Sequence, residues 1–118
     1  MPATMIEKTW QVVEAGREAH ARSHRAGVRM VFGTDLLGEM HRHQSEEFVI
    51  RGRALPAIEV LRSTSKHAAK LLRREGQIGT IAPGAYADMI LVDGDPLKDL
   101  SLLTGQGKRI PAIIKGGK

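Results

Sequence analysis

The 118-residue sequence contains no cysteine. A disulfide framework and a thiolate metal site are therefore both excluded. Aromatic residues are also scarce, since the chain has one Trp, one Tyr and two Phe although 42% of its residues are hydrophobic. The core of the expected globular fold must therefore consist mainly of Leu, Ile, Val, Met and Ala side chains.

The sequence also lacks an apolar leader and a long apolar run at its start, which predicts a cytoplasmic protein with no membrane segment. Eighteen Lys and Arg against 13 Asp and Glu give a net charge of +5, enough to attract anionic partners weakly at low salt. These charges are scattered from Glu7 to Lys118 with few aromatic side chains between them. We therefore expect no nucleic-acid partner.

The first third of the chain predicts one helix followed by one buried strand. Apolar residues at helical spacing predict a helix from about Met5 to Ala26, and Gly27 supplies the left-handed residue that commonly ends a helix. The apolar run Val28–Phe32 then reads as a strand buried on both faces, which is typical of parallel sheets covered by helices. We expect an α/β fold in which Asp35 lies just beyond the C-terminal end of this strand, where the chemistry of α/β enzymes collects.

Helices dominate from Ser45 to Arg74, and the composition changes at Gly76 to a stretch punctuated by Gly and Pro. We therefore predict a domain boundary near Glu75, between a first domain of residues 1–75 and a second of residues 76–118. The predicted elements are a helix beginning at Ser45, a helix from Pro56 that extends to Leu72, strands at Met89–Val92 and Ile110–Ile114, and a short helix at Leu97–Leu103.

Three stretches carry a more specific signal. They read GVRMVFGTD at residues 27–35, IGTIAPGAYADMILV at residues 78–92 and DGDPLKD at residues 93–99. In this order they resemble the amidohydrolase family, and most closely its imidazolonepropionase-like and prolidase-like branch, whose Xaa-Pro dipeptidase-type enzymes act on Xaa-Pro or N-acyl amino acid substrates. The resemblance covers most of the chain, and it is more specific for the family than for a substrate.

This resemblance implies a distorted TIM barrel, a (β/α)8 fold, flanked by a small β-sandwich built from both chain ends. Residues 1–75 would supply the last helix-strand-helix portion of the barrel, and residues 76–118 the C-terminal share of the sandwich. Asp35 then stands where the family keeps its final metal-ligating aspartate. There it would bind a zinc ion and accept a proton from the metal-bound water that attacks the amide carbonyl. A complete family member would hold one or two such divalent ions.

Asp35 and the segment after it also allow simpler interpretations. A lone Asp after a strand is commonly a turn or helix-cap residue, although its place in the motif favours the catalytic interpretation. His41-Arg42-His43 imitates a His-x-His metal pair, but it follows Asp35 in a loop, so we do not expect it to bind metal. These three residues either meet a substrate carboxylate above the end of the strand or are solvated loop residues.

We expect structural roles for the remaining histidines and aspartates. His20 and His24 are four residues apart on the first predicted helix, a spacing suited to a metal ion, but their basic surroundings indicate a solvated helix face. The same holds for His67. We expect Asp88 to bond to backbone amides of the turn that precedes it. The aspartates that we interpret as turn formers are Asp93 and Asp95.

The family's other metal ligands have no counterpart in this sequence. We therefore predict the C-terminal part of a zinc-dependent hydrolase of C–N bonds, inactive alone because catalytic zinc needs about three protein ligands. Its expected partners are a small-molecule or dipeptide substrate and either a second copy of the chain, in a homo-oligomer, or the missing N-terminal half. The alternative hypothesis is a truncated, non-catalytic paralogue that acts as an oligomer or as a partner-binding module.

Overall fold

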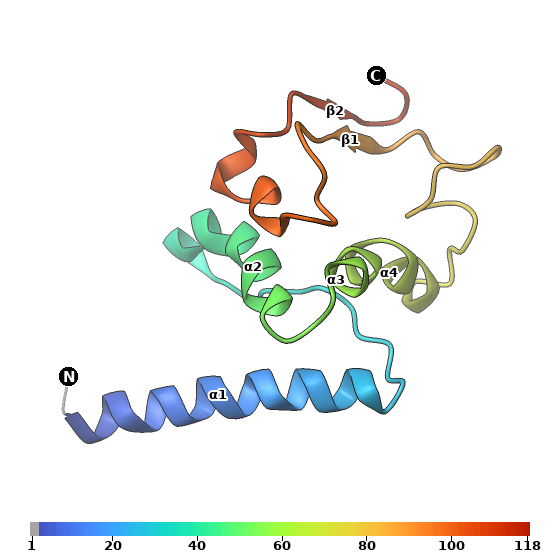
Figure 1. Ribbon diagram of the computed structural model, residues 1–118. Coiled ribbons are helices and arrows are strands. Elements are labelled where there is room, and N and C mark those ends of the chain that lie inside the picture. Colours follow the sequence, from blue (N-terminus) through green and yellow to red (C-terminus); the bar gives the residue numbers. More distant parts are fainter. Residues whose placement is uncertain (1–2) are drawn as a thin grey trace.

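The computed structural model describes residues 3–118, which form short helices, helical turns and one small sheet beside a long N-terminal helix (Figure 1). The molecule is elongated, with principal extents of 54 × 33 × 28 Å. Its elements are, in order, α1 (Ala3–Arg25), the 3-10 helix η1 (Gly38–Glu46), α2 (Glu47–Gly52), α3 (Ala57–Thr64), α4 (Lys66–Leu71), β1 (Met89–Leu91), the 3-10 helices η2 (Leu100–Leu103) and η3 (Gly105–Gly107), and β2 (Ala112–Ile114).

Helix α1 agrees with the helix that the sequence predicts, and it lies along one side of the other elements (Figure 1). It ends in a turn where Gly27 adopts a φ of 75° and the amide of Val28 donates to the carbonyl of Ser23 over 2.9 Å. The left-handed glycine and this bond across the helix end are the two parts of a Schellman cap. The side chain of Trp10 remains 68% exposed, so this residue contributes little to the core.

The buried strand predicted at Val28–Phe32 is not formed within the described residues. The segment belongs to no sheet within residues 3–118, and Val28 is 55% exposed. Its contacts come from the helices instead, since the amide of Phe32 donates to the carbonyl of Ser63 over 3.1 Å. A strand needs neighbouring strands to satisfy its backbone groups and to cover its faces. The described part of the chain places no strand beside this segment.

The core lies among the short helices. Helix α2 packs closely on η2, because a Cβ added to Gly52 would lie 2.7 Å from Cδ1 of Leu100. The close approach requires glycine at this position unless the leucine side chain shifts. The most deeply buried hydrophobic side chains of the described residues are Leu55, Val60, Ala69 and Leu103. The core is therefore aliphatic, as the composition predicts.

Two helices replace the single helix expected from Pro56 to Leu72. Helix α3 begins directly after Pro56 as predicted, but the chain breaks at Ser65, where φ is −125° and ψ is −89°. The hydroxyl of Ser65 donates to the carbonyl of Leu61 over 2.9 Å. Serine hydroxyls that bond back to the preceding turn compete with the helical ladder and bend helices. The helix expected from Ser45 also differs slightly, since α2 begins at Glu47 after η1.

The C-terminal part of the chain contains the sheet. Strands β1 and β2 pair antiparallel with Ile90 opposite Ile113, and both lie within runs that the sequence predicts as strands. They form a two-stranded sheet within residues 3–118, so the expected sandwich is not seen there. The helix predicted at Leu97–Leu103 is reduced to the short turn η2, which Asp99 caps by accepting the amide of Ser101 over 2.9 Å.

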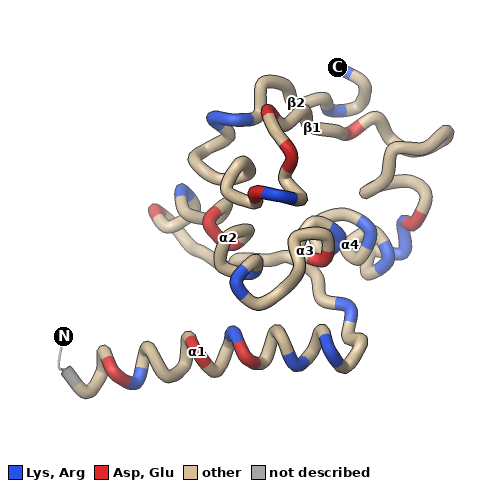
Figure 2. Tube along the Cα trace, viewed as in Figure 1, with Lys and Arg blue, Asp and Glu red and all other residues tan. Residues whose placement is uncertain are grey.

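Charged residues of both signs are mixed along α1 and are spread over the rest of the chain, whereas the charged residues of α4 are only lysines (Figure 2). No helix of the described residues is both long enough and apolar enough to cross a membrane. The predicted domain boundary near Glu75 falls in a turn where Arg73 and Gly76 have positive φ angles of 55° and 77°. The division into two domains at this turn stays a prediction.

Candidate functional site

The candidate site begins where the chain passes from the extended segment into the loop that carries Asp35. Asp35 is exposed, and its backbone φ of 52° lies in the left-handed region. Asp adopts this region more readily than most residues other than Gly. Strained backbone of this kind clusters at functional sites, where the surrounding structure determines it. Arg73 and Gln106 share this conformation, with φ angles of 55° and 58°, so the conformation alone assigns Asp35 no role.

Two helices hold the backbone that precedes this loop. Besides the bond from Phe32 to Ser63, His67 on α4 donates from Nδ1 to the carbonyl of Met30 over 3.2 Å. His67 is half-buried, so the prediction of a solvated side chain is wrong for this residue. Ser63 is itself fixed, because its hydroxyl donates to the carbonyl of Val60 over 2.6 Å. The extended segment is thus anchored by α3 and α4.

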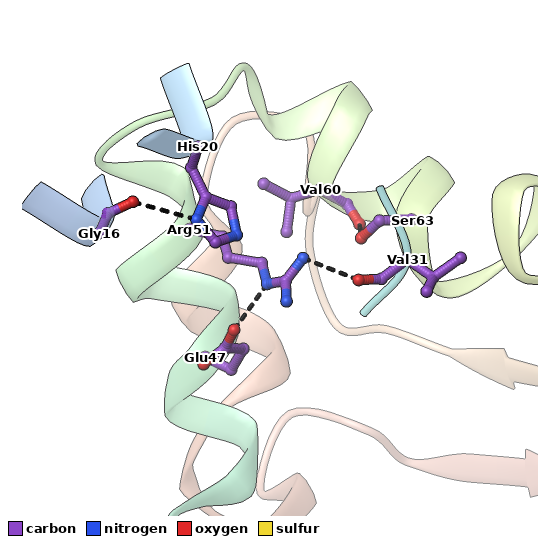
Figure 3. Close-up of polar contacts among 7 residues, drawn as sticks. All are labelled: Gly16, His20, Val31, Glu47, Arg51, Val60 and Ser63. Carbon is purple, nitrogen blue, oxygen red and sulfur yellow. Dashed lines mark hydrogen bonds and ion pairs between the residues drawn. The ribbon is translucent and has the colours of Figure 1, made fainter. Parts of the chain in front are cut away.

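A buried arginine on α2 provides a third anchor (Figure 3). The Arg51 side chain is 8% exposed, and its Nε donates to Oε1 of Glu47 over 2.6 Å. Its Nη1 donates to the carbonyl of Val31 over 3.0 Å. The guanidinium carbon lies 5.1 Å from the centroid of the Phe32 ring, which packs against the ring of Phe48 at 4.6 Å. Arg51 thus joins α2 to the segment that leads to Asp35.

The predicted substrate residues lie on η1 and interact with one another. Nδ1 of His43 donates to Oε1 of Glu46 over 2.7 Å, and Nε of Arg42 donates to Nε2 of His43 over 3.1 Å. Both ring nitrogens of His43 are therefore occupied, while His41 is exposed. The carbonyl of Arg42 accepts a bond from Nε2 of Gln106 over 2.7 Å. This bond ties η1 to η3. Within residues 3–118 the Arg42 side chain donates through Nε, and its terminal N–H groups have no hydrogen-bond partner there, so they can serve a further acceptor.

A cavity of about 270 Å³ brings η1, α2 and the Asp35 loop together. Thr34 and Leu36, the two neighbours of Asp35, contribute to its wall, and so does His43. Asp35 itself does not line this cavity, so the structure brings His43 near the loop but not onto the Asp35 carboxylate. The complete lining consists of Thr34, Leu36, Met40, His43, Glu46, Glu47 and Ile50.

The comparisons with known proteins decide the family. The sequence model of the amidohydrolase family matches residues 3–118. The chain belongs to the amidohydrolase family. It is 21% identical over 119 residues to an ochratoxinase of Aspergillus niger, which covers 97% of this chain and 25% of that protein. The chain therefore spans about a quarter of the length of this curated relative.

Solved structures place this amidohydrolase chain among prolidase-like proteins. A prolidase complexed with N-methylphosphonate-L-proline shares 42% identity and a TM-score of 0.88, with 100% of this chain and 29% of that chain covered. A Xaa-Pro dipeptidase with bound methionine shares 33% identity and a TM-score of 0.76 over 86% of this chain and 24% of that chain. The prolidase-like branch that the sequence motifs indicate is confirmed.

The metal-binding capacity of this amidohydrolase chain rests on few side chains. Within residues 3–118 no group of three or more His, Cys, Asp or Glu side chains is arranged to hold a metal ion. The exposed carboxylate of Asp35 is a donor type that zinc and other divalent ions accept. His20 is bonded from Nδ1 to the carbonyl of Gly16 at 3.2 Å, and it forms no metal group with His24. The chain can thus offer Asp35 as one ligand of a larger site.

The aspartates of the C-terminal part of the amidohydrolase chain have structural contacts. Asp88 accepts the amide of Gly116 over 2.7 Å and the ammonium of Lys115 over 2.9 Å. Both bonds lower the pKa of the Asp88 carboxyl, the Gly116 amide most strongly. The structural role is as predicted, but the partner is wrong, because the bonds reach the C-terminal end of the chain instead of the preceding turn. Asp95 accepts the amide of Leu97 over 3.0 Å as a turn former.

The sequence alone assigned no functional role to three residues near the site, which are Glu47, Arg51 and Gln106. The spacing of Glu47 and Arg51, four residues apart on a helix, is a recognisable ion-pair signal. The sequence does not show that this pair is buried or that it faces the segment before Asp35. Gln106 gives no local signal, because its bond to Arg42 spans 64 residues. These residues support the site without carrying a motif.

Proposed function

We propose that this chain supplies the aspartate-bearing part of the active site in a metal-dependent amidohydrolase that hydrolyses C–N bonds of Xaa-Pro dipeptides or N-acyl amino acids. The observation that carries the proposal is the 42% identity, across the whole chain, to a prolidase solved with N-methylphosphonate-L-proline. The similarity to a Xaa-Pro dipeptidase supports the same substrate class. The proposed cofactor is zinc, as one or two divalent ions in the complete protein.

Asp35 is the residue of this chain that would act on the reacting atoms. Its carboxylate would ligate the metal and act as general base, taking a proton from the water that attacks the scissile carbonyl. The metal, when bound, supplies Lewis-acid polarisation and lowers the pKa of water to about 7. Because Asp35 is the one ligand that we assign to this chain, we propose that the chain alone is inactive, since catalytic zinc needs about three protein ligands.

Substrate recognition would fall to η1. The terminal N–H groups of Arg42, which have no partner among the described residues, suit a planar carboxylate, such as the one at the proline end of a Xaa-Pro dipeptide. His43 is held by Glu46 and bonded to Arg42, so it would orient the guanidinium instead of binding substrate directly. His41 is exposed beside them and would supply a further donor to the same carboxylate.

A chimera tests the proposal. The present chain would replace the matching stretch of the prolidase to which it is 42% identical, and zinc content and hydrolysis of Xaa-Pro dipeptides and N-acyl amino acids would be measured. We expect turnover in the chimera, its loss with reduced zinc in Asp35→Asn, and neither change in Asp95→Asn, a matched turn aspartate. The 118-residue chain alone should bind no stoichiometric zinc and turn over no substrate. Full turnover in the Asp35→Asn chimera would refute the assigned role.

One observation favours the second candidate function, a non-catalytic module that binds a partner or a second copy. Helix α1 leaves apolar side chains uncovered at helical spacing on one face, with Ile6 44%, Trp10 68% and Val13 46% exposed. Large exposed apolar groups of this kind mark interaction surfaces. Light scattering on the purified chain separates the two functions, because a stable, monodisperse oligomer without zinc would support the module. Aggregation would count against it.

A further inference from the structure

Arg51 is buried more deeply than an ion pair on a helix surface requires. Burying a guanidinium costs free energy, and a buried ion pair is weak evidence of a gain in stability. Helix α3 carries an Arg62–Glu59 pair with the same 2.6 Å separation, but the Arg62 side chain is 48% exposed and its bond stays within its own helix. Arg51 also reaches the Val31 carbonyl and the Phe32 ring. These added contacts indicate a role in placing the segment.

The segment that Arg51 holds leads directly to Asp35. Two residues separate Phe32 from Asp35, and neither belongs to a helix or a strand. The contacts at Val31 and Phe32 therefore set the direction in which the chain enters the loop. Asp35 then adopts its left-handed φ of 52°, a conformation that persists only where surrounding contacts determine it.

Glu47, the ion-pair partner of Arg51, also lies close to this loop. Its side chain is 22% exposed and lines the cavity of about 270 Å³ together with Thr34 and Leu36. Because Arg51 donates to Oε1 of Glu47, it also holds this part of the cavity wall. One guanidinium thus orients the backbone before Asp35 and the wall beside it.

We propose that Arg51 is a positioning residue for Asp35. Its N–H donors, shared between Glu47 and the Val31 carbonyl, hold the backbone that presents the Asp35 carboxylate. The proposal rests on the proposed function of Asp35. Arginine suits this task because its planar guanidinium bonds two acceptors in fixed directions at once, whereas a lysine ammonium is a point charge on a flexible stem.

Two variants of the 118-residue chain separate position from stability. Arg51→Lys keeps the positive charge beside Glu47 but loses the fork that also reaches Val31. Glu47→Gln keeps an oxygen acceptor for Arg51 but leaves its buried charge without a counter-charge, which lowers stability. NMR measures the backbone conformation of Asp35, because a residue with a left-handed φ gives a strong NOE between its own amide and α hydrogens. We expect Arg51→Lys to lose this NOE at Asp35, and Glu47→Gln to lower the urea midpoint while keeping it.

Arg62→Lys is the matched control, because it alters an exposed Arg–Glu pair of the same length. It should change neither readout. An NOE at Asp35 that survives in both Arg51→Lys and Arg51→Met would overturn the proposal. Loss of the NOE in Glu47→Gln, in step with its urea midpoint, would also overturn it, since Arg51 would then act through stability alone. If Arg51→Met does not fold, the difference in the Asp35 NOE between Arg51→Lys and Glu47→Gln still tests the proposal.

The prolidase chimera adds a kinetic readout that does not depend on the NMR signals. A displaced Asp35 should lower kcat with little change in KM, so we expect this pattern in Arg51→Lys and not in Arg62→Lys. Unchanged kcat in Arg51→Lys would contradict the proposal. Failure of the proposed function looks different, because turnover would then survive in Asp35→Asn while the NMR contrast between Arg51→Lys and Glu47→Gln would remain.

Discussion

Replacing Gly79 by alanine should break the packing between the corner of α3 and α4 and the loop that follows α4. Gly79 has a φ of 68°, and a Cβ there would lie 2.6 Å from the carbonyl oxygen of Ser65. That oxygen cannot easily move, because it accepts the amide of Ala69 over 2.8 Å. Left-handed backbone costs an L-residue about 1–2 kcal/mol, and overpacking adds about 1–3 kcal/mol. We therefore expect Gly79→Ala to lower the free energy of unfolding by about 2–5 kcal/mol.

Gly84→Ala is the matched control for this prediction. Gly84 has a φ of 84°, but a Cβ there would meet nothing within 4 Å, so only the backbone cost of about 1–2 kcal/mol applies. Urea unfolding followed by far-UV circular dichroism measures both losses against the unchanged chain. Equal losses in the two variants would refute the reasoning, because the contact between Gly79 and Ser65 would then have no energetic effect.

The remaining predictions concern the hairpin and the core. The pKa of Asp88 lies below its ordinary value of 3.8 because the carboxylate accepts the Gly116 amide and the Lys115 ammonium. A lowered folded-state pKa adds stability above the unfolded value that is lost as pH falls through the folded value. Asp88→Asn should therefore reduce the loss of stability below pH 3.8. Urea midpoints at neutral and acidic pH check this, and a variant that loses as much stability in acid as the unchanged chain would contradict the prediction. Val60 is 0% exposed, so Val60→Ala should lower the free energy of unfolding by about 2–3 kcal/mol. Trp10→Ala should lower the free energy of unfolding by less than about 0.5 kcal/mol. Equal urea midpoints for Val60→Ala and Trp10→Ala would contradict the placement of Val60 in the core and Trp10 outside it.

The family and the candidate catalytic residue were accessible from sequence because both rest on short contiguous patterns. The stretch at residues 27–35 carries Asp35 within its motif, and the family match over residues 3–118 confirms the assignment of the family. The role of Asp35 stays a prediction. The supporting residues could not be found in this way, since Arg51 matters through a carbonyl 20 residues earlier in the chain.

The break at Ser65 shows how local signals compete. Apolar spacing predicts one helix through this position, and helices lie on both sides of the break, but Ile58 and Leu72 of the apolar set are 40% and 60% exposed. The hydroxyl of Ser65 and the close approach of Gly79 to its carbonyl favour a corner instead. Helical periodicity predicts that a segment is helical, but it does not report where a backbone carbonyl meets another segment.

The sequence by itself determined the features that depend on residues close together along the chain. Helix α1 follows from apolar periodicity, its end from the left-handed preference of Gly27, and the turn at Asp95 from a side chain that bonds two residues ahead. Tertiary structure alone decided the contacts between distant segments. The carboxylate of Asp88 accepts the amide of Gly116, 28 residues later in the chain. Within residues 3–118 the run Val28–Phe32 is held by helices instead of by strands. Local conformational preferences act through neighbouring atoms, whereas burial and long-range hydrogen bonds depend on which segments the whole fold brings together.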